Sequence, residues 1–116
     1  MSTFIHRTAD FDGVSATLLR DGPLISGLVV AAAGAAGLSA SAAPAVRALG
    51  ADGVTAILAL EADGGHIAVH TFPDRKLLLF DVLAPSTRET EKAIDVFVRR
   101  LGATGIRTSE TRRGAG

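Results

Sequence analysis

Alternating or short apolar runs along the chain predict a set of β-strands. Each run has four to eight residues and is bounded by turn-forming residues such as Gly, Pro and Asp. These runs cover residues 6–11, 54–60, 66–71, 76–83 and 106–111. Residues 39–49 occupy the position of a further strand, although Pro44 and the small residues around it have a low preference for one.

Two other segments have the periodicity of helices. Residues 24–36 follow Pro23 and precede Gly37, which are typical residues for the first turn and the C-terminal cap of a helix. Residues 87–101 form the clearest amphipathic pattern, and Gly102 ends it. Its apolar stripe contains Ala93, Ile94, Phe97, Val98 and Leu101.

The order of these elements is strand, helix, three or four strands, helix, strand. This order predicts an α+β fold, a two-layer sandwich with an antiparallel β-sheet and two helices packed on one face. The length of 116 residues predicts a single domain, 1–116. We expect residues 112–116 to form a frayed tail.

The composition excludes several classes of protein. Hydrophobic residues make up 47% of the chain, which argues against disorder throughout. Twelve basic and twelve acidic residues give a net charge of zero, so we expect no nucleic acid as a partner. The chain has no cysteine, which excludes disulfides and thiolate chemistry and is compatible with a cytoplasmic location.

The uncharged stretch from Gly22 to Val46 is long enough to cross a membrane. Its strongly apolar part is short, and the remainder is Ala, Gly and Ser interrupted by Pro44. These features favour a buried soluble helix followed by a strand. A membrane or export segment is the alternative interpretation.

Two histidines and one aspartate form the first candidate catalytic group. His66 and His70 share one face of their strand because side chains alternate along it. A hairpin centred near residues 74–75 would pair His70 with Leu79 and His66 with Leu83, and it would place Asp81 diagonally between the two histidines. A His–Asp pair suits general base catalysis. Alternatively, Asp81 and a histidine simply satisfy each other on a half-buried face. The two histidines are ~13 Å apart on a strand, so we expect no metal.

The sequence from Gly64 to Asp74 reads Gly-Gly-His-Ile-Ala-Val-His-Thr-Phe-Pro-Asp. It resembles the processing-site motif of the prokaryotic S-adenosylmethionine decarboxylases, which reads Glu-Ser-His, an apolar-small-apolar step, then His-Thr-Trp-Pro-Glu. The order of elements from about His6 to Gly114 is similar to that of this family as well. The resemblance implies the same α+β sandwich.

The resemblance also implies a degenerate processing site. In the family, the serine of the motif cleaves the chain and becomes a pyruvoyl cofactor. Here Gly65 stands at the serine position, Gly64 replaces the preceding glutamate, and Pro85 stands where the family has a proton-donating cysteine. His70 matches the histidine that assists processing. We therefore expect no self-cleavage and no pyruvoyl cofactor.

Other residues of the motif are candidates for ligand binding. Phe72 occupies the position of the family's tryptophan and could stack on a purine, or it could simply pack on a neighbour in the hairpin. The Asp63-Gly64-Gly65 segment could hold a phosphate, although a plain connection is favoured. Possible ligands are S-adenosylmethionine or a related metabolite. The family builds its sites across a dimer interface, and the apolar runs 77–80 and 24–36 favour a homodimer.

Two classes of function remain open at this point. The first is a repurposed enzyme that acts on a small polar metabolite through His70, His66 and Asp81. The second is a non-catalytic binding or regulatory subunit of an active decarboxylase or another enzyme, which would relate it to polyamine biosynthesis. His70 and Asp81 favour the enzyme, and the replaced processing residues favour the subunit.

Overall fold

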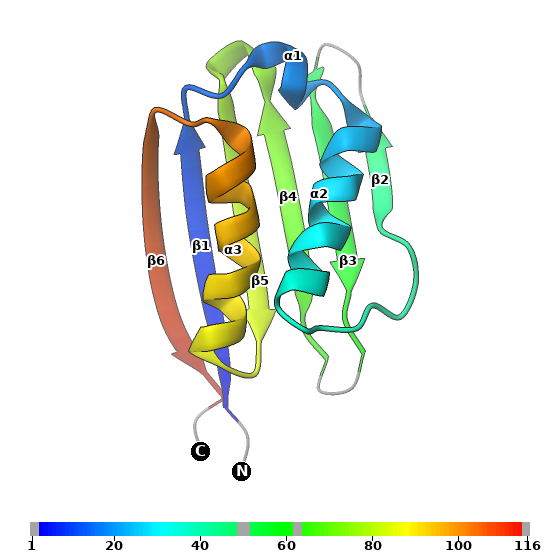
Figure 1. Cartoon of the computed structure of the whole chain (residues 1–116), viewed down its shortest axis with the longest axis vertical. Coiled ribbons are helices and arrows are strands. Elements are labelled where there is room, and N and C mark those ends of the chain that lie inside the picture. Colours follow the sequence, from blue (N-terminus) through cyan, green and yellow to red (C-terminus); the bar gives the residue numbers. More distant parts are fainter. Residues whose placement is uncertain (1–2, 49–51, 62–63, 115–116) are drawn as a thin grey trace.

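The computed structural model describes residues 3–48, 52–61 and 64–114. Six strands form one antiparallel sheet with the order β2-β3-β4-β5-β1-β6 (Figure 1). The strands are β1 (Phe4–Asp12), β2 (Ala45–Ala48), β3 (Val54–Ala59), β4 (His66–Phe72), β5 (Leu77–Ala84) and β6 (Gly105–Arg113).

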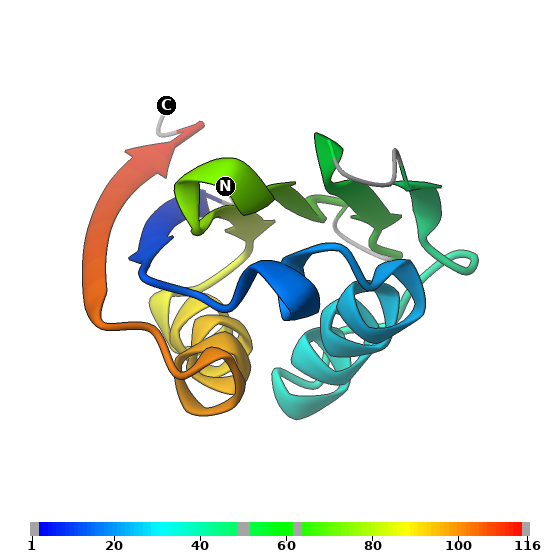
Figure 2. The ribbon, with the colours of Figure 1, turned by 90° about the horizontal axis from the view of Figure 1, so that it is seen from above.

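Two long helices, α2 (Gly22–Ala35) and α3 (Thr87–Leu101), lie on the same side of the sheet (Figure 2). A short helix, α1 (Ala16–Leu19), links β1 to α2. The side chains of Asp21 and Ser86 cap α2 and α3 by accepting backbone N–H groups, and Gly102 ends α3 in a left-handed conformation. The predicted α+β sandwich is therefore confirmed. The other sheet face carries neither of the two long helices, and a short 3₁₀ helix, η2 (Pro73–Arg75), forms the turn between β4 and β5.

Aromatic and aliphatic side chains fill the space between the sheet and the helices. The ring of Phe97 on α3 lies 6.4 Å from that of Phe11 and 4.8 Å from that of Phe80, measured between centroids. Thr71 is the polar residue at one end of this core. Its hydroxyl donates to the Leu19 carbonyl at 2.7 Å and accepts the Val54 N–H at 2.8 Å. Thr71 therefore links α1 to β3 and β4.

Two expectations about strand boundaries are wrong. Of the strand expected over 39–49, residues 39–48 form only β2, Ala45–Ala48, and one isolated bridge between Ala40 and Leu60, while Leu49 lies outside the described residues. Pro44 has no N–H to donate to a sheet ladder, and the residues of β2 are exposed and bury little surface. Residues 112–113 are not frayed, because they continue β6 and pair with Ile5 and Phe4 of β1. Residues 115–116 of the expected tail lie outside the described residues.

The uncharged stretch from Gly22 forms α2, which has 14 residues. A span needs about 20 apolar residues. In the described part of the chain, no helix meets the length and hydropathy that a membrane crossing requires.

Candidate functional site

The hairpin of β4 and β5 has the register that the sequence predicts. His66 pairs with Leu83, Ala68 with Asp81, and His70 with Leu79. Ile67 and Val69 alternate with the histidines and are fully buried against the helices. The two histidines and Asp81 therefore lie on the sheet face that no described helix covers, which we call the open face.

Asp81 has a partner that the sequence did not predict. Its Oδ1 lies 3.0 Å from Nε2 of His6 on β1, and both side chains are about two-thirds buried. β1 pairs with the other edge of β5, so His6 and Asp81 are diagonal neighbours across that ladder. A carboxylate can only accept, so Nε2 of His6 carries the proton of this hydrogen bond. Predicting the contact required knowing that β1 lies beside β5, and nothing local in the sequence reports this.

His66 lies on the other side of Leu83 from His6, because both histidines pair with that residue. Burial lowers the pKa of His66 below 6.5, although the nearby Asp81 carboxylate opposes the shift. Electrostatic interactions with His6 and with Arg113 lower the pKa further. His66 is therefore a neutral imidazole at neutral pH, which is able to accept a proton.

A cavity lies on the open face beside these histidines. It measures about 250 Å³ and is lined by Phe4, Leu83, Arg113 and Gly114. Leu83, one of the lining residues, pairs with His6 on one side and with His66 on the other. One charged group and two apolar side chains thus line a space that a small molecule could occupy, and one of these side chains, Leu83, lies between the two histidines.

His70 does not belong to this group. Its Nδ1 lies 3.2 Å from the hydroxyl of Thr55 on β3. It stands four residues along β4 from His66, a distance of ~13 Å. Asp81 hydrogen-bonds to His6 rather than to His70 or His66. Among the residues that the structure describes, no three His, Cys, Asp or Glu side chains gather as a metal site would require.

Phe72 lies at the far end of β4 from Gly65, ~23 Å away at the rise of a strand. Its side chain is exposed, and the guanidinium carbon of Arg75 lies 5.9 Å from the centre of its ring. The two residues that the sequence suggested for ligand binding are therefore not brought together within one chain.

Gly65 has a backbone conformation that a side chain would not tolerate. Its φ is +99°, and a Cβ atom added there would overlap the carbonyl oxygen of Leu83. Gly64 also has a positive φ, +78°, but a Cβ there would meet no atom of the described residues within 4 Å. Pro85 follows β5 and lines a small cavity of about 150 Å³ together with Gly64. Asp63, the first residue of the suggested phosphate loop, lies outside the described residues.

The comparisons with known proteins agree with this architecture. The family model for S-adenosylmethionine decarboxylase matches residues 5–114, so the chain belongs to that family. The crystal structure of the adenosylmethionine decarboxylase from Aquifex aeolicus VF5 superposes with a TM-score of 0.89 at 24% identity. The match covers 99% of this chain and 93% of that one, and it shows a shared fold. No curated protein gives a significant sequence match.

Proposed function

We propose that this chain is a member of the S-adenosylmethionine decarboxylase family that forms no pyruvoyl group. The position of Gly65 in the motif carries this proposal. Glycine has no hydroxyl to attack the preceding carbonyl, so Gly65 cannot be converted to a pyruvoyl group. Its backbone geometry leaves no room for a serine Cβ either.

Intact-mass spectrometry of the purified protein tests this proposal. We expect one species at the mass of the uncut chain, 11.8 kDa. Two fragments, of which the second begins with a ketone, would contradict it. Treatment with a carbonyl-reactive hydrazide gives an independent measurement, because a chain without a pyruvoyl group gains no mass from it.

The chemistry that remains is acid–base chemistry at the open face. We propose that His66 accepts a proton from a small polar metabolite. The hydrogen bond from Nε2 of His6 to Asp81 holds the imidazole of His6 in place. Nδ1 of His6 can then bind the same metabolite or exchange a proton with it. The support for this role is the lowered pKa of His66 and its position next to Leu83, which lines a cavity together with Arg113.

S-adenosylmethionine is the first molecule to test, because the family takes its name from it. Calorimetry should compare the wild type with His66→Gln and with His70→Gln as a matched control outside the group. We expect His66→Gln to weaken binding and His70→Gln to leave it unchanged. If neither S-adenosylmethionine nor related amino acids bind, the enzyme proposal fails at this site.

A second candidate function is that of a non-catalytic subunit. It is favoured by apolar side chains on the open face, where Ile57 is 44% exposed and Phe72 is 37% exposed. Such side chains are typical of a surface that pairs with another protein. The partner would be a second copy of this chain or an active decarboxylase of the polyamine pathway. Co-purification with such a decarboxylase, together with a change in its rate, would support this alternative over the enzyme.

A further inference from the structure

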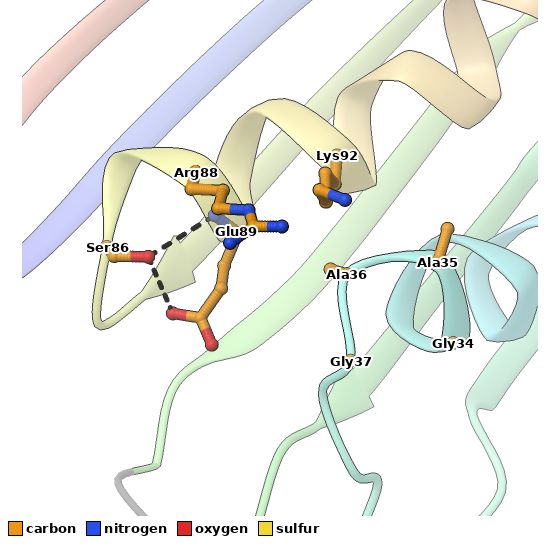
Figure 3. Close-up of a pocket in the computed structure, with 8 residues that line it drawn as sticks. All are labelled: Gly34, Ala35, Ala36, Gly37, Ser86, Arg88, Glu89 and Lys92. Carbon is orange, nitrogen blue, oxygen red and sulfur yellow. Dashed lines mark hydrogen bonds between the residues drawn. The ribbon is translucent and has the colours of Figure 1, made fainter.

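A third cavity lies on the helix side of the molecule, away from the histidines. It measures about 530 Å³, which is within the size range of small-molecule sites. It lies between the end of α2 and the first two turns of α3 (Figure 3). Its lining residues are Gly34, Ala35, Ala36, Gly37, Ser86, Arg88, Glu89 and Lys92.

The α3 wall of this cavity carries two cationic side chains. Arg88 and Lys92 are four residues apart, so they lie one above the other on the same face of the helix. Figure 3 shows both side chains extending toward the end of α2. Within residues 3–48, 52–61 and 64–114, neither Arg88 nor Lys92 forms an ion pair.

The acidic residue in the cavity is already engaged at the start of α3. The carboxylate of Glu89 accepts the hydroxyl of Ser86 at 2.9 Å, and the Ser86 oxygen accepts the Glu89 N–H at 3.3 Å. This reciprocal cap holds the carboxylate beside Ser86 (Figure 3). Two cations and one engaged anion leave a net positive wall, and the positive end of the α3 dipole adds to it.

The opposite wall consists of small residues at the end of α2. Gly34 lies inside the helix, where glycine costs about 1 kcal/mol relative to alanine. Apart from the backbone of α2 itself, a Cβ added to Gly34 would meet no atom within 4 Å among the described residues, so no packing contact among them requires a glycine here. The small residues keep this side of the cavity empty and let a ligand approach the backbone.

From these two walls we propose that the cavity between α2 and α3 binds a small metabolite through an oxyanion, either a phosphate or a carboxylate. Arg88 and Lys92 contact the oxyanion, and the uncharged part of the ligand lies against Gly34 and Ala35. This site is separate from the open face, so the result of its test does not depend on the function proposed above.

The test follows backbone amide shifts in the ¹⁵N-labelled full chain during titration with sodium phosphate and, separately, sodium acetate at constant ionic strength. We expect saturable shifts at the amides of Arg88, Glu89 and Gly34 for at least one anion. The anion that binds more tightly distinguishes a phosphate ligand from a carboxylate ligand.

Variants decide whether the cavity itself is responsible. Arg88→Gln with Lys92→Gln should weaken the affinity at least about tenfold, since two charge-assisted contacts are lost. Arg99→Gln with Arg100→Gln removes the same charge from the other end of α3 and should leave the affinity unchanged. Ala35→Leu should weaken binding by filling the cavity without changing its charge. Equal losses in both charge pairs, or shifts that never saturate, would overturn the proposal.

Discussion

At the scale of single residues, the substitutions in the processing motif are coupled to the backbone around them. Gly65 is not a serine position that has merely lost its hydroxyl, because its φ of +99° and the adjoining carbonyl of Leu83 exclude any Cβ. Gly64 has a similar conformation, but in the described part of the chain no atom lies within 4 Å of a Cβ added to it. The two glycines therefore respond differently to the same substitution, which makes the geometry testable.

We predict that Gly65→Ser does not restore self-cleavage and destabilises the fold by more than about 2 kcal/mol, because it combines an unfavourable φ with a steric overlap. Gly64→Ser, which meets only the unfavourable φ, should cost about 1 kcal/mol. Urea unfolding measures both costs, and intact mass reports cleavage. A cleaved Gly65→Ser chain would show that the backbone rearranges readily.

The pKa of His66 predicts how stability depends on pH. The pKa of His66 is below 6.5 in the folded state and near 6.5 in the unfolded chain. As the pH falls, the unfolded chain therefore protonates this imidazole before the folded state does. The contribution of His66 to stability is therefore complete above pH 6.5 and is lost as the pH falls from 6.5 toward the lowered folded-state pKa. His66→Gln should flatten that part of the curve. Proton NMR titration of the imidazole should give a midpoint below 6.5, and a higher midpoint would contradict the burial argument.

At the scale of secondary-structure elements, the hairpin is the part of the site that the sequence specifies well. Its register follows from a short turn and from the alternating direction of side chains along each strand, and both are local properties. The contact between His6 and Asp81 was not predictable, because it depends on β1 lying beside β5 rather than beside another strand. The length of β2 was also missed, since small exposed residues carry no periodic signal. The conformation of Gly65 was hidden for the opposite reason, because glycine is compatible with almost any backbone.

The link between α1 and the sheet gives a prediction at this scale. Thr71→Val keeps the shape of the side chain but leaves the buried Val54 N–H and the Leu19 carbonyl without their hydroxyl partner. We expect a loss of about 2–4 kcal/mol in the free energy of unfolding. Thr108→Val, at an exposed position of β6, is the matched control and should change it by less than about 0.5 kcal/mol. Similar losses in both variants would show that the hydroxyl contacts contribute little.

At the scale of the whole molecule, both long helices cover one side of the sheet and leave the open face to solvent (Figure 2). Ile57 and Phe72 are exposed on this face. A second copy of the chain would bury these side chains if the two open faces packed together. The candidate site would then lie at the boundary between two chains.

We predict that the protein is a homodimer of about twice 11.8 kDa and that Ile57→Lys dissociates it. A buried lysine without a partner is costly at an interface, whereas an exposed one on the monomer costs less than about 0.5 kcal/mol. Light scattering coupled to size-exclusion chromatography measures the mass. Thr108→Lys, on the helix side of β6, is the control. A monomeric wild type would exclude the pairing.

The position of β6 beside β1 has a consequence for how the chain folds. Every residue pair between these strands joins positions about a hundred residues apart, and the ladder that the pairs form is among the longest in the sheet. Such contacts close a loop of about a hundred residues, which slows folding.

Because Phe4 and Arg113 are already paired neighbours, a short peptide could connect the two ends and new ends could be opened between α3 and β6. This circular permutant would convert the slowest contact into a local hairpin, and it should fold faster than the natural order of the chain.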